Sequence, residues 1–404
     1  MNKPLSGIKM VELSVMVAGP VCGRLMEDLG AEVIKLERAE GDGWRTTGKN
    51  HNLKRFSDEE NPIFDVFNAG KRMLSLDLRT AEGQEIFHKL LSETDIFMSN
   101  MRPQSLKKMH VHYEDLCPKY PRLIYALGLG YGEKGPEADT PAYDTTAFWS
   151  RPGFLTDSRP EGSAEVVSAP SSMGDTFTGM NMTTEICAAL FNRERTGKGC
   201  VVKSSLYHCG IYSQQIMMLL AQGEEGFAYP RKRLEKAPFH EAYMCKDGEF
   251  VYIALQDALK QLPQQYKLLG LDDMMQDKYL QMPERWDNRE YIHQRLIEGY
   301  LKEDSTTWIE KARGTGLPIT RMGHFCEIPQ DEQAWANDYL EKVEYPNGHV
   351  EVVATTPVEI EGVEKAPMKP ARRIGQDSEE ILKELGYTQE QIDTLREAGV
   401  ITVK

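Results

Sequence analysis

The feature that most constrains the fold is an alternation of short apolar runs with amphipathic stretches, which begins at residue 8. Residues 8–13 and 31–36 are rich in branched apolar side chains and are typical of buried β-strands. Between them, residues 21–29 place apolar side chains on one helical face, and Gly30 stands where a helix ends. This spacing predicts a βαβ unit with two parallel strands.

The same alternation continues through the first half of the chain. We expect further strands at residues 74–78, 95–98, 123–127 and 201–206. Helical periodicity follows Thr80 and recurs near 104–109 and 182–193, and a separate helical stretch runs from the strand at 201–206 through Gln222. Helices between successive strands cover both faces of a parallel sheet, and ligands of such sheets bind beyond the carboxyl ends of the strands. The pattern therefore predicts an α/β fold with its ligand site at that edge.

Turn-forming sequences divide the rest of the chain. Residues 223–240 are polar and contain two prolines, so we interpret them as a linker. Asp247-Gly248 and Asn347-Gly348 each separate two apolar runs, and each predicts a β-hairpin. Residues 379–399 are predicted to be helical. We expect three segments, with a large domain at 1–225 that ends in a connecting helix, a small α+β domain at 226–328, and a last segment at 329–404.

Composition argues against several classes of protein. The 404-residue chain has a formal net charge of −14, which speaks against nucleic-acid binding. No run approaches the roughly 18 apolar residues of a membrane span, and the start of the chain lacks a signal-peptide pattern. The seven cysteines include no Cys-x-x-Cys pair, so neither a disulfide framework nor a zinc site is expected. We expect a folded cytoplasmic protein that binds no nucleic acid, membrane or metal ion.

Many basic residues fall within the first 110 positions, several of them just after predicted strands. This set includes Lys35, Arg38, Arg45, Lys54, Arg55, Lys71, Arg72, Arg102, Lys107 and Lys108. On an acidic protein, a local cationic site suits an anionic small ligand. The alternative is that these are ordinary solvated side chains, and the residues by themselves leave both interpretations open.

Asp175 is the candidate catalytic carboxylate, because it follows Gly174 in a loop of small residues at 169–180. The predicted helix at 182–193 comes next, so we expect Asp175 in a loop that leads into a buried helix. The amides and partial positive charge of a helix N-terminus would keep the carboxylate ionised. The alternative is that Asp175 only caps this helix.

Six motifs, in order and spacing, resemble those of the class III CoA-transferase family. They are Ala18-Gly-Pro20, Gly30-Ala-Glu-Val-Ile-Lys-Leu-Glu37, Gly70-Lys-Arg72, Gly132-Glu-Lys-Gly-Pro136, Gly174-Asp175 and Thr196-Gly-Lys-Gly199. The resemblance spans nearly the whole chain. It is closest to the branch that acts on 2-hydroxyacyl groups, such as phenyllactate and 2-hydroxyisocaproate, in amino-acid fermentation. Residues 58–62, 130–136 and 331–340 carry that finer match.

The resemblance implies a fold and a set of site residues. The family has a Rossmann-like large domain built from both chain ends, to which residues 329–404 would return, together with a small domain and an interlocked homodimer. Its catalytic aspartate falls on Asp175. CoA-contacting positions fall on Met16, Val17, Ala18, Arg38, Lys71, Asn100, Met101 and Lys108. A candidate acyl pocket falls on Tyr143, Asp144 and Thr176.

The resemblance also implies the reaction. CoA would move between an acyl-CoA and a small carboxylic acid through an anhydride and a CoA thioester on Asp175, without cofactor or metal ion. Three departures from the family pattern affect substrate choice or loop closure. Val17 replaces the glutamine of formyl-CoA transferases, residues 255–258 replace a glycine run, and Thr176 follows the aspartate where the 2-hydroxyacyl branch commonly has histidine. With Met16 and Met101, Val17 favours a bulky apolar 2-hydroxy acid over oxalate.

Two alternatives remain open. Acyl-CoA racemases of the same fold use a second base, the histidine of a Gly-His-Asp motif, and the matching residues here are Ala142-Tyr143-Asp144. A tyrosine phenol is a poor base at neutral pH, so racemisation is not expected. A CoA-binding protein without turnover would keep the basic residues but would not need Asp175.

Overall fold

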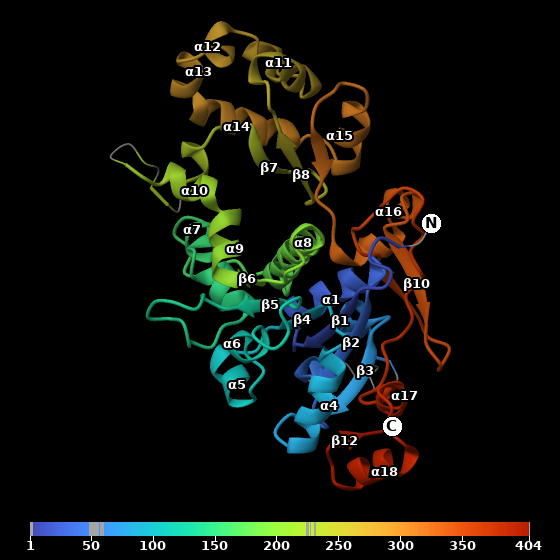
Figure 1. Cartoon of the computed structure of the whole chain (residues 1–404). Coiled ribbons are helices and arrows are strands. Elements are labelled where there is room, and N and C mark those ends of the chain that lie inside the picture. Colours follow the sequence, from blue (N-terminus) through green and yellow to red (C-terminus); the bar gives the residue numbers. More distant parts are fainter. Residues whose placement is uncertain are drawn as a thin grey trace. The chain divides into compact units, whose positions relative to one another are not determined.

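The computed structural model describes residues 3–47, 56, 60–223, 226, 228–229 and 232–403. Two basic residues, Lys54 and Arg55, and motif positions 58–59 lie outside the described residues. The chain forms two compact units (Figure 1). Unit 1 comprises Met1–Leu155, Ser168–Leu219 and Asp331–Lys404, and unit 2 comprises Thr156–Val167 and Leu220–Gln330. No helix in the described ranges is long and apolar enough to cross a bilayer.

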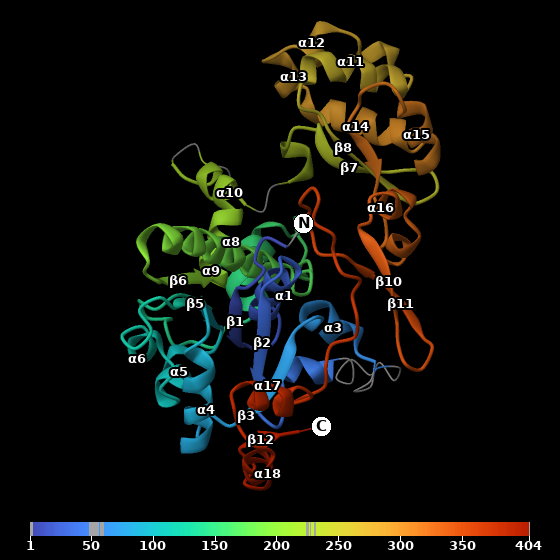
Figure 2. The ribbon, with the colours of Figure 1, turned by 45° about the vertical axis from the view of Figure 1, so that its right-hand side comes forward.

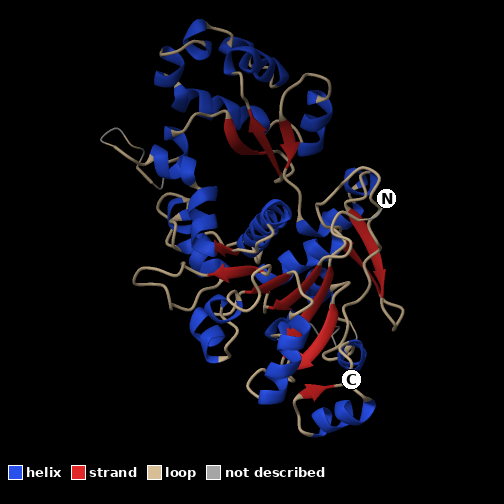
Figure 3. Ribbon diagram, in the orientation of Figure 1, coloured by secondary structure: helices blue, strands red, loops and turns tan. Residues whose placement is uncertain are grey.

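The described part of unit 1 contains a seven-stranded sheet in the order β12-β3-β2-β1-β4-β5-β6. Strands are drawn in red in Figure 3. The strands of this sheet are β1 (Lys9–Leu13), β2 (Glu32–Glu37), β3 (Arg72–Leu76), β4 (Ile96–Ser99), β5 (Ile124–Leu129), β6 (Val201–Ser205) and β12 (Ile401–Thr402). β12 runs antiparallel to β3, and the other strand pairs are parallel. The predicted α/β fold with a mostly parallel sheet is confirmed.

Helices cover both faces of this sheet. They include α1 (Ala18–Asp28), α4 (Ala81–Leu91), α8 (Met173–Thr196), α17 (Ser378–Glu384) and α18 (Gln389–Glu397). Successive strand residues point to opposite faces, so Met10 joins an apolar cluster with residues of α1 and α8, whereas Val11 joins a second cluster with residues of α4, α17 and α18. Figure 2 shows α17 and α18, in red, beside β3 and β12.

Unit 1 also contains shorter elements and a hairpin. They are η1 (Gly43–Thr46), α3 (Pro62–Asn68), α5 (Pro103–Lys108), α6 (Tyr113–Leu116), the π-helical turn η2 (Asp144–Ser150), α9 (Leu206–Ser213), α16 (Glu332–Ala336), β10 (Leu340–Glu344) and β11 (Val350–Ala354). Two further helices begin in unit 1 and end in unit 2, namely α7 (Phe154–Asp157) and α10 (Gln215–Leu220). β10 and β11 pair antiparallel around Asn347-Gly348, which confirms the predicted hairpin. The Tyr345 hydroxyl donates to Asp65 Oδ2 at 2.8 Å and links this hairpin to α3.

Unit 2 is built on a three-stranded antiparallel sheet in the order β7-β8-β9. Its described elements are η3 (Arg233–Glu235), β7 (His240–Met244), β8 (Phe250–Ala254), α11 (Ala258–Leu268), η4 (Asp272–Met274), α12 (Asp277–Leu280), α13 (Glu284–Asp287), α14 (Arg289–Tyr300), α15 (Ser305–Ala312), β9 (Ile319–Arg321) and η5 (Phe325–Gln330). The hairpin predicted at Asp247-Gly248 is confirmed. Its core includes Tyr243, Val251 and Trp308.

Candidate active site

The carboxyl ends of β1 and β4 meet where the strand order of the sheet reverses. In open α/β sheets, ligands bind in the crevice at such a point. The residues that follow the two strands are hydrogen-bonded to each other: Val15 N–H donates to Asn100 Oδ1 at 2.9 Å, and Asn100 Nδ2 donates to the Val15 carbonyl at 2.7 Å. Asn100 therefore fastens the turn that leads from β1 into α1.

Only part of this turn is accessible in unit 1. Val15 is 40% exposed and Met16 is half-buried, whereas Val17 is 1% and Ala18 7% exposed. Met16 has φ 66°, in the left-handed region. The N-cap residue of α1 is Val17, whose hydrocarbon side chain cannot cap the helix, and no side-chain cap hydrogen bond is formed. A contact between CoA and Val17 or Ala18 would therefore involve the backbone more than the side chains.

Asp175 lies inside the first turn of α8, which corrects the expectation that it precedes the helix. The helix begins at Met173, after Ser172 with φ 64°. A Cβ at Gly179 would lie 2.6 Å from the Ala18 carbonyl oxygen, so α8 packs directly on the start of α1 at this glycine. Residues four apart share one face of a helix. Asp175 is thus on the face of α8 that packs against α1.

A second carboxylate, Asp144, approaches the start of α8 from η2. Asp144 is 6% exposed, and neither of its carboxylate oxygens has a hydrogen-bond partner among the described residues. A Cβ at Gly174 would lie 2.2 Å from Asp144 Oδ1 and 2.3 Å from Phe148 Cγ. Only glycine at position 174 allows this approach.

The environment of the two carboxylates favours their protonated forms. Burial, and to a lesser extent the charge of Asp144, raise the pKa of Asp175 to about 7. Burial also raises the pKa of Asp144, and the nearby amides of Ser172, Gly174 and Asp175 oppose this rise. These amides do not form full hydrogen bonds with the Asp144 carboxylate. At neutral pH, Asp175 is therefore balanced between its ionised form and its protonated form.

The structure places the other expected acyl-pocket residues near these carboxylates. Thr176 follows Asp175 in α8, and its hydroxyl donates to the Ser172 carbonyl at 2.9 Å. Tyr143 precedes Asp144, and its side chain is 60% exposed. Two cations expected to contact CoA are exposed. Arg38 directly follows the carboxyl end of β2, and Lys108 is the last residue of α5, the helix that follows β4. Met101, after β4, is half-buried and packs against the core.

Lys71 does not lie with these cations. It immediately precedes β3, at the amino end of that strand, and its side chain is 0% exposed. Its ammonium lies 2.8 Å from Glu12 Oε2 and donates to the Pro20 carbonyl at 2.8 Å. Burial lowers the pKa of Lys71, and the Glu12 carboxylate opposes this shift. In this structure Lys71 has a buried structural contact in place of the expected contact with CoA.

Sequence reasoning missed the buried charges beside Lys71. Glu12 and Lys35 are both 0% exposed and form a 3.0 Å ion pair, and Lys35 also lies 3.1 Å from Asp42 Oδ2. One signal was present in the sequence, because each of β1 and β2 carries a charged residue within an otherwise apolar run. Isolated charges of this kind are seldom buried unless they are paired.

Among the described residues, one group has the ligand types of a metal site. Nitrogen and oxygen atoms of Glu60, His349 and Glu351 lie within 4.8 Å of one another. His349 is hydrogen-bonded to Glu60, which also accepts from the Asn347 amide. These contacts link the β10–β11 hairpin to the segment before α3.

The fold and the site together define an α/β enzyme with a carboxylate at the carboxyl edge of a Rossmann-like sheet. A family model described as "CoA-transferase family III" matches residues 5–378. The chain therefore belongs to CoA-transferase family III, as the resemblance predicted, and it is a CoA-transferase.

Relatives of known activity match the whole chain. It is 36% identical to the (R)-2-hydroxy-4-methylpentanoate CoA-transferase of Clostridioides difficile over 98% of this chain and 99% of that protein. It is 34% identical to the cinnamoyl-CoA:phenyllactate CoA-transferase of Clostridium sporogenes, over 99% of this chain and 97% of that protein. A solved structure of a CAIB/BAIF family protein from Brucella suis superposes with a TM-score of 0.78 and 28% identity, over 95% of this chain and 100% of that one.

Proposed function

We propose that this enzyme transfers CoA between an acyl-CoA thioester and a 2-hydroxy acid with a bulky apolar or aryl side chain, with Asp175 as the nucleophile. The observation that carries the proposal is the position of Asp175, in the first turn of α8 on the face that packs against α1. The 2-hydroxyacyl substrates named for two relatives, at 36% and 34% identity, support the acid class.

The reaction balances without a proton donor or a redox partner. An Asp175 carboxylate oxygen attacks the thioester carbonyl, the carbon–sulfur bond breaks, and a mixed anhydride and CoA thiolate form. The thiolate attacks the Asp175 carbonyl and releases the donor acid. The acceptor carboxylate then attacks the resulting aspartyl-CoA thioester and expels the thiolate again. A last thiolate attack on the acceptor acyl carbonyl yields the new acyl-CoA and restores Asp175.

The neighbours of Asp175 suit this sequence. Each cycle alternates between a charged carboxylate and neutral acyl forms of the same side chain. A buried setting that raises the pKa of Asp175 disfavours its ionised form, and it thereby assists conversion into the neutral anhydride and thioester. The first amides of α8 lie beside Asp175 and would favour negative charge that develops on attacking or departing oxygens.

Trapping of the intermediate tests the covalent route. Hydroxylamine converts an activated aspartyl group into a stable hydroxamate, so incubation with acyl-CoA should add this group to Asp175, detected by peptide mass spectrometry. Acyl-CoA donors assayed against a panel of 2-hydroxy acids and oxalate would identify the acid class. Efficient transfer to oxalate, with none to phenyllactate or 2-hydroxyisocaproate, would refute the proposed substrates.

Racemisation is the alternative within the same fold, and the sequence argues against it, because the motif in which racemases carry a histidine reads Ala142-Tyr143-Asp144 here. Tyr143 occupies that position. The nearest histidines in sequence lie at 110 and 112, and His112 is 1% exposed with its ring at the start of α6. The enzyme held with acyl-CoA in D₂O should leave the α-hydrogen in place. Rapid deuterium uptake without an acceptor acid would favour the racemase.

We also propose that two copies of the chain form a homodimer, interlocked as in the family. An exposed apolar surface on α9 and α10 supports this assembly, because Tyr212, Ile216 and Leu219 are 62%, 68% and 60% exposed. Contiguous apolar surface of this kind marks protein interfaces. Light scattering should give twice the chain mass, and Ile216→Lys with Leu219→Lys should shift the protein towards monomer. A monomeric wild type at micromolar concentration would contradict the assembly.

A further inference from the structure

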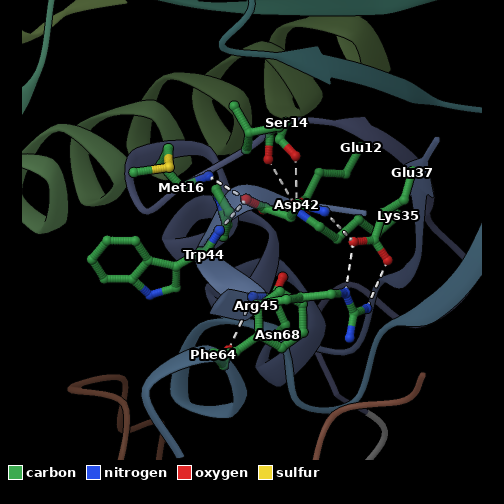
Figure 4. Close-up of polar contacts among 12 residues, drawn as sticks. Glu12, Ser14, Met16, Lys35, Glu37, Asp42, Trp44, Arg45, Phe64 and Asn68 are labelled. Carbon is green, nitrogen blue, oxygen red and sulfur yellow. Dashed lines mark hydrogen bonds and ion pairs between the residues drawn. The ribbon is translucent and has the colours of Figure 1, made fainter. Parts of the chain in front are cut away.

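Buried charges hold the turn between β1 and α1, residues 14–18 (Figure 4). Asp42 Oδ1 accepts a hydrogen bond from Met16 N–H at 3.0 Å. Lys35 Nζ donates to the Ser14 carbonyl at 2.8 Å. Asp42 and Lys35 also pair with each other at 3.1 Å, and both side chains are 0% exposed. Two sides of the turn are therefore bound to one ion pair.

Glu12 joins this pair to the start of α1. Its Oε1 accepts from Lys35 at 3.0 Å and from the Ser14 hydroxyl at 2.7 Å. Its Oε2 lies 2.8 Å from Lys71 Nζ, which donates to the Pro20 carbonyl. Burial would raise the pKa of Glu12, but the two ammonium groups hold it below its usual value. The network thus donates hydrogen bonds to backbone carbonyls on both sides of Met16, those of Ser14 and Pro20.

Met16, whose N–H donates to Asp42, has a strained backbone conformation. Its φ of 66° lies in the left-handed region, which side chains with a Cβ disfavour. Asp42 is well placed to stabilise this conformation, because the same Oδ1 accepts from Trp44 N–H at 3.0 Å and the Asp42 N–H donates to Glu37 Oε1 at 3.0 Å. The acceptor that faces Met16 is therefore itself fixed by η1 and β2.

Stability alone does not account for these charges. The attraction between two buried charges offsets little more than the free-energy cost of removing them from water. Well-packed apolar side chains of equal volume are often at least as stabilising. What the charged groups add is direction, since each aims a hydrogen bond at a particular backbone atom. Strained backbone that the surroundings hold in place is typical of functional sites.

We infer that Asp42 is a positioning residue for CoA transfer, which holds Met16 in its left-handed conformation and thereby shapes the turn that receives the acyl-CoA. This inference rests on the proposed function, because it assumes that the turn contacts the substrate. Asp42 does not touch the reacting atoms, since its carboxylate is buried and acts through the Met16 amide.

A double-mutant cycle tests this role in the full-length enzyme. Glycine adopts the left-handed conformation without a steric penalty, so Met16→Gly should remove the need for Asp42. Asp42→Ala should lower kcat/KM by about 10- to 100-fold when residue 16 is Met, but by less than about threefold when residue 16 is Gly. Equal losses in both backgrounds would overturn the inference.

Asp42→Asn covers the case in which the alanine variant does not fold. The amide oxygen of the new asparagine still accepts from Met16 N–H, so the loss in kcat/KM should be smaller, about 3- to 10-fold. This loss should again shrink in the Met16→Gly background. Asp65→Ala is the matched control, because it removes another buried carboxylate, which is 4% exposed and bound to Tyr345. It should lower thermal stability without changing kcat/KM of the folded enzyme in either background.

The wild type separates this inference from the proposed function. If wild type transfers CoA and forms the Asp175 hydroxamate while the cycle is additive, only the role of Asp42 is wrong. If wild type neither transfers CoA nor binds it in calorimetry, the proposed function and this inference fail together.

Discussion

The charge of Asp144 helps to raise the pKa of Asp175, and the missing side chain of Gly174 allows the Asp144 carboxylate to approach the start of α8. Burial is the larger cause of the shift, and Asp144 adds to it. This relationship connects the π-helical turn η2 with the first turn of α8, two elements separated by more than twenty residues of chain.

The first prediction concerns the pH dependence of transfer. Attack requires an ionised Asp175, so kcat/KM should rise with pH through about 7, the pKa of Asp175. Asp144→Asn removes the neighbouring charge, so the acid limb of the profile should move to lower pH. Asp139→Asn, which removes an exposed carboxylate of the same unit, should leave the limb in place. An unchanged limb in Asp144→Asn would show that Asp144 does not influence the nucleophile.

The second prediction joins activity to stability at Asp175. Asp175→Asn should fold and lose transfer, because an amide cannot supply the attacking carboxylate. A raised pKa means that the folded state favours the protonated acid, so wild type loses stability as pH rises from about 4 towards 7. The variant should therefore be more stable than wild type by roughly 1–4 kcal/mol at pH 8 and by less at pH 5, measured by urea unfolding. A variant that is less stable at pH 8 would contradict the raised pKa.

The third prediction concerns the close approach at Gly174. A methyl group there would lie 2.2 Å from Asp144 Oδ1, so Gly174→Ala must displace η2 or the start of α8. We expect a loss of about 1–3 kcal/mol in unfolding free energy and of at least about tenfold in kcat/KM. Gly323→Ala is the control, since its methyl group would meet Glu327 at an ordinary 3.5 Å. Normal kinetics in Gly174→Ala would show that the close approach of Asp144 to Gly174 is not needed for activity.

The fourth prediction separates the exposed cations from the buried one. Arg38→Gln and Lys108→Gln should raise KM for the CoA ester, with little effect on stability. Each charged hydrogen bond that is lost should weaken binding of the ester by up to roughly 1.5–3 kcal/mol. The increase in KM should shrink at high salt, because mobile ions already screen exposed charges. Lys119→Gln, an exposed lysine elsewhere in unit 1, should not change KM. Unchanged KM in both variants would exclude these residues from the nucleotide site.

The fifth prediction concerns Lys71. Lys71→Gln leaves the carboxylate of Glu12 buried with one cation fewer, and such a loss typically costs about 3–5 kcal/mol. Unfolding free energies should therefore fall far more in Lys71→Gln than in Arg38→Gln. Similar stabilities for the two variants, together with a raised KM in Lys71→Gln, would restore Lys71 as a direct contact with CoA.

Much of the fold follows from local physics that the sequence displays. Apolar runs of strand length between amphipathic helices predict the parallel sheet, because each strand must be buried on both faces. Thr80 caps α4 by accepting from Gly83 N–H at 3.0 Å, as its position before a helical pattern predicts. The turns at Asp247-Gly248 and Asn347-Gly348 require positive φ at glycine and form the expected hairpins.

Elements without a strong local pattern were missed or misplaced. The first turns of α8 contain glycines, threonines and polar residues with no apolar period, so the sequence predicted a later start. β12 spans only two residues and is held by pairing with β3. The expected helix at 379–399 is two helices, α17 and α18, with Gly386 at φ 84° between them.

By itself, the sequence determined the α/β class, the family and the identity of Asp175 as the candidate nucleophile, because these depend on periodicity and on short contiguous motifs. The tertiary structure alone decided that the charge of Asp144 acts on Asp175, that Asp42 accepts a hydrogen bond from Met16, and that Lys71 is buried against Glu12. Each of these pairs joins residues 26 to 59 positions apart in the numbering. Their distance, burial and charge depend on how strands and helices pack, which no local pattern encodes.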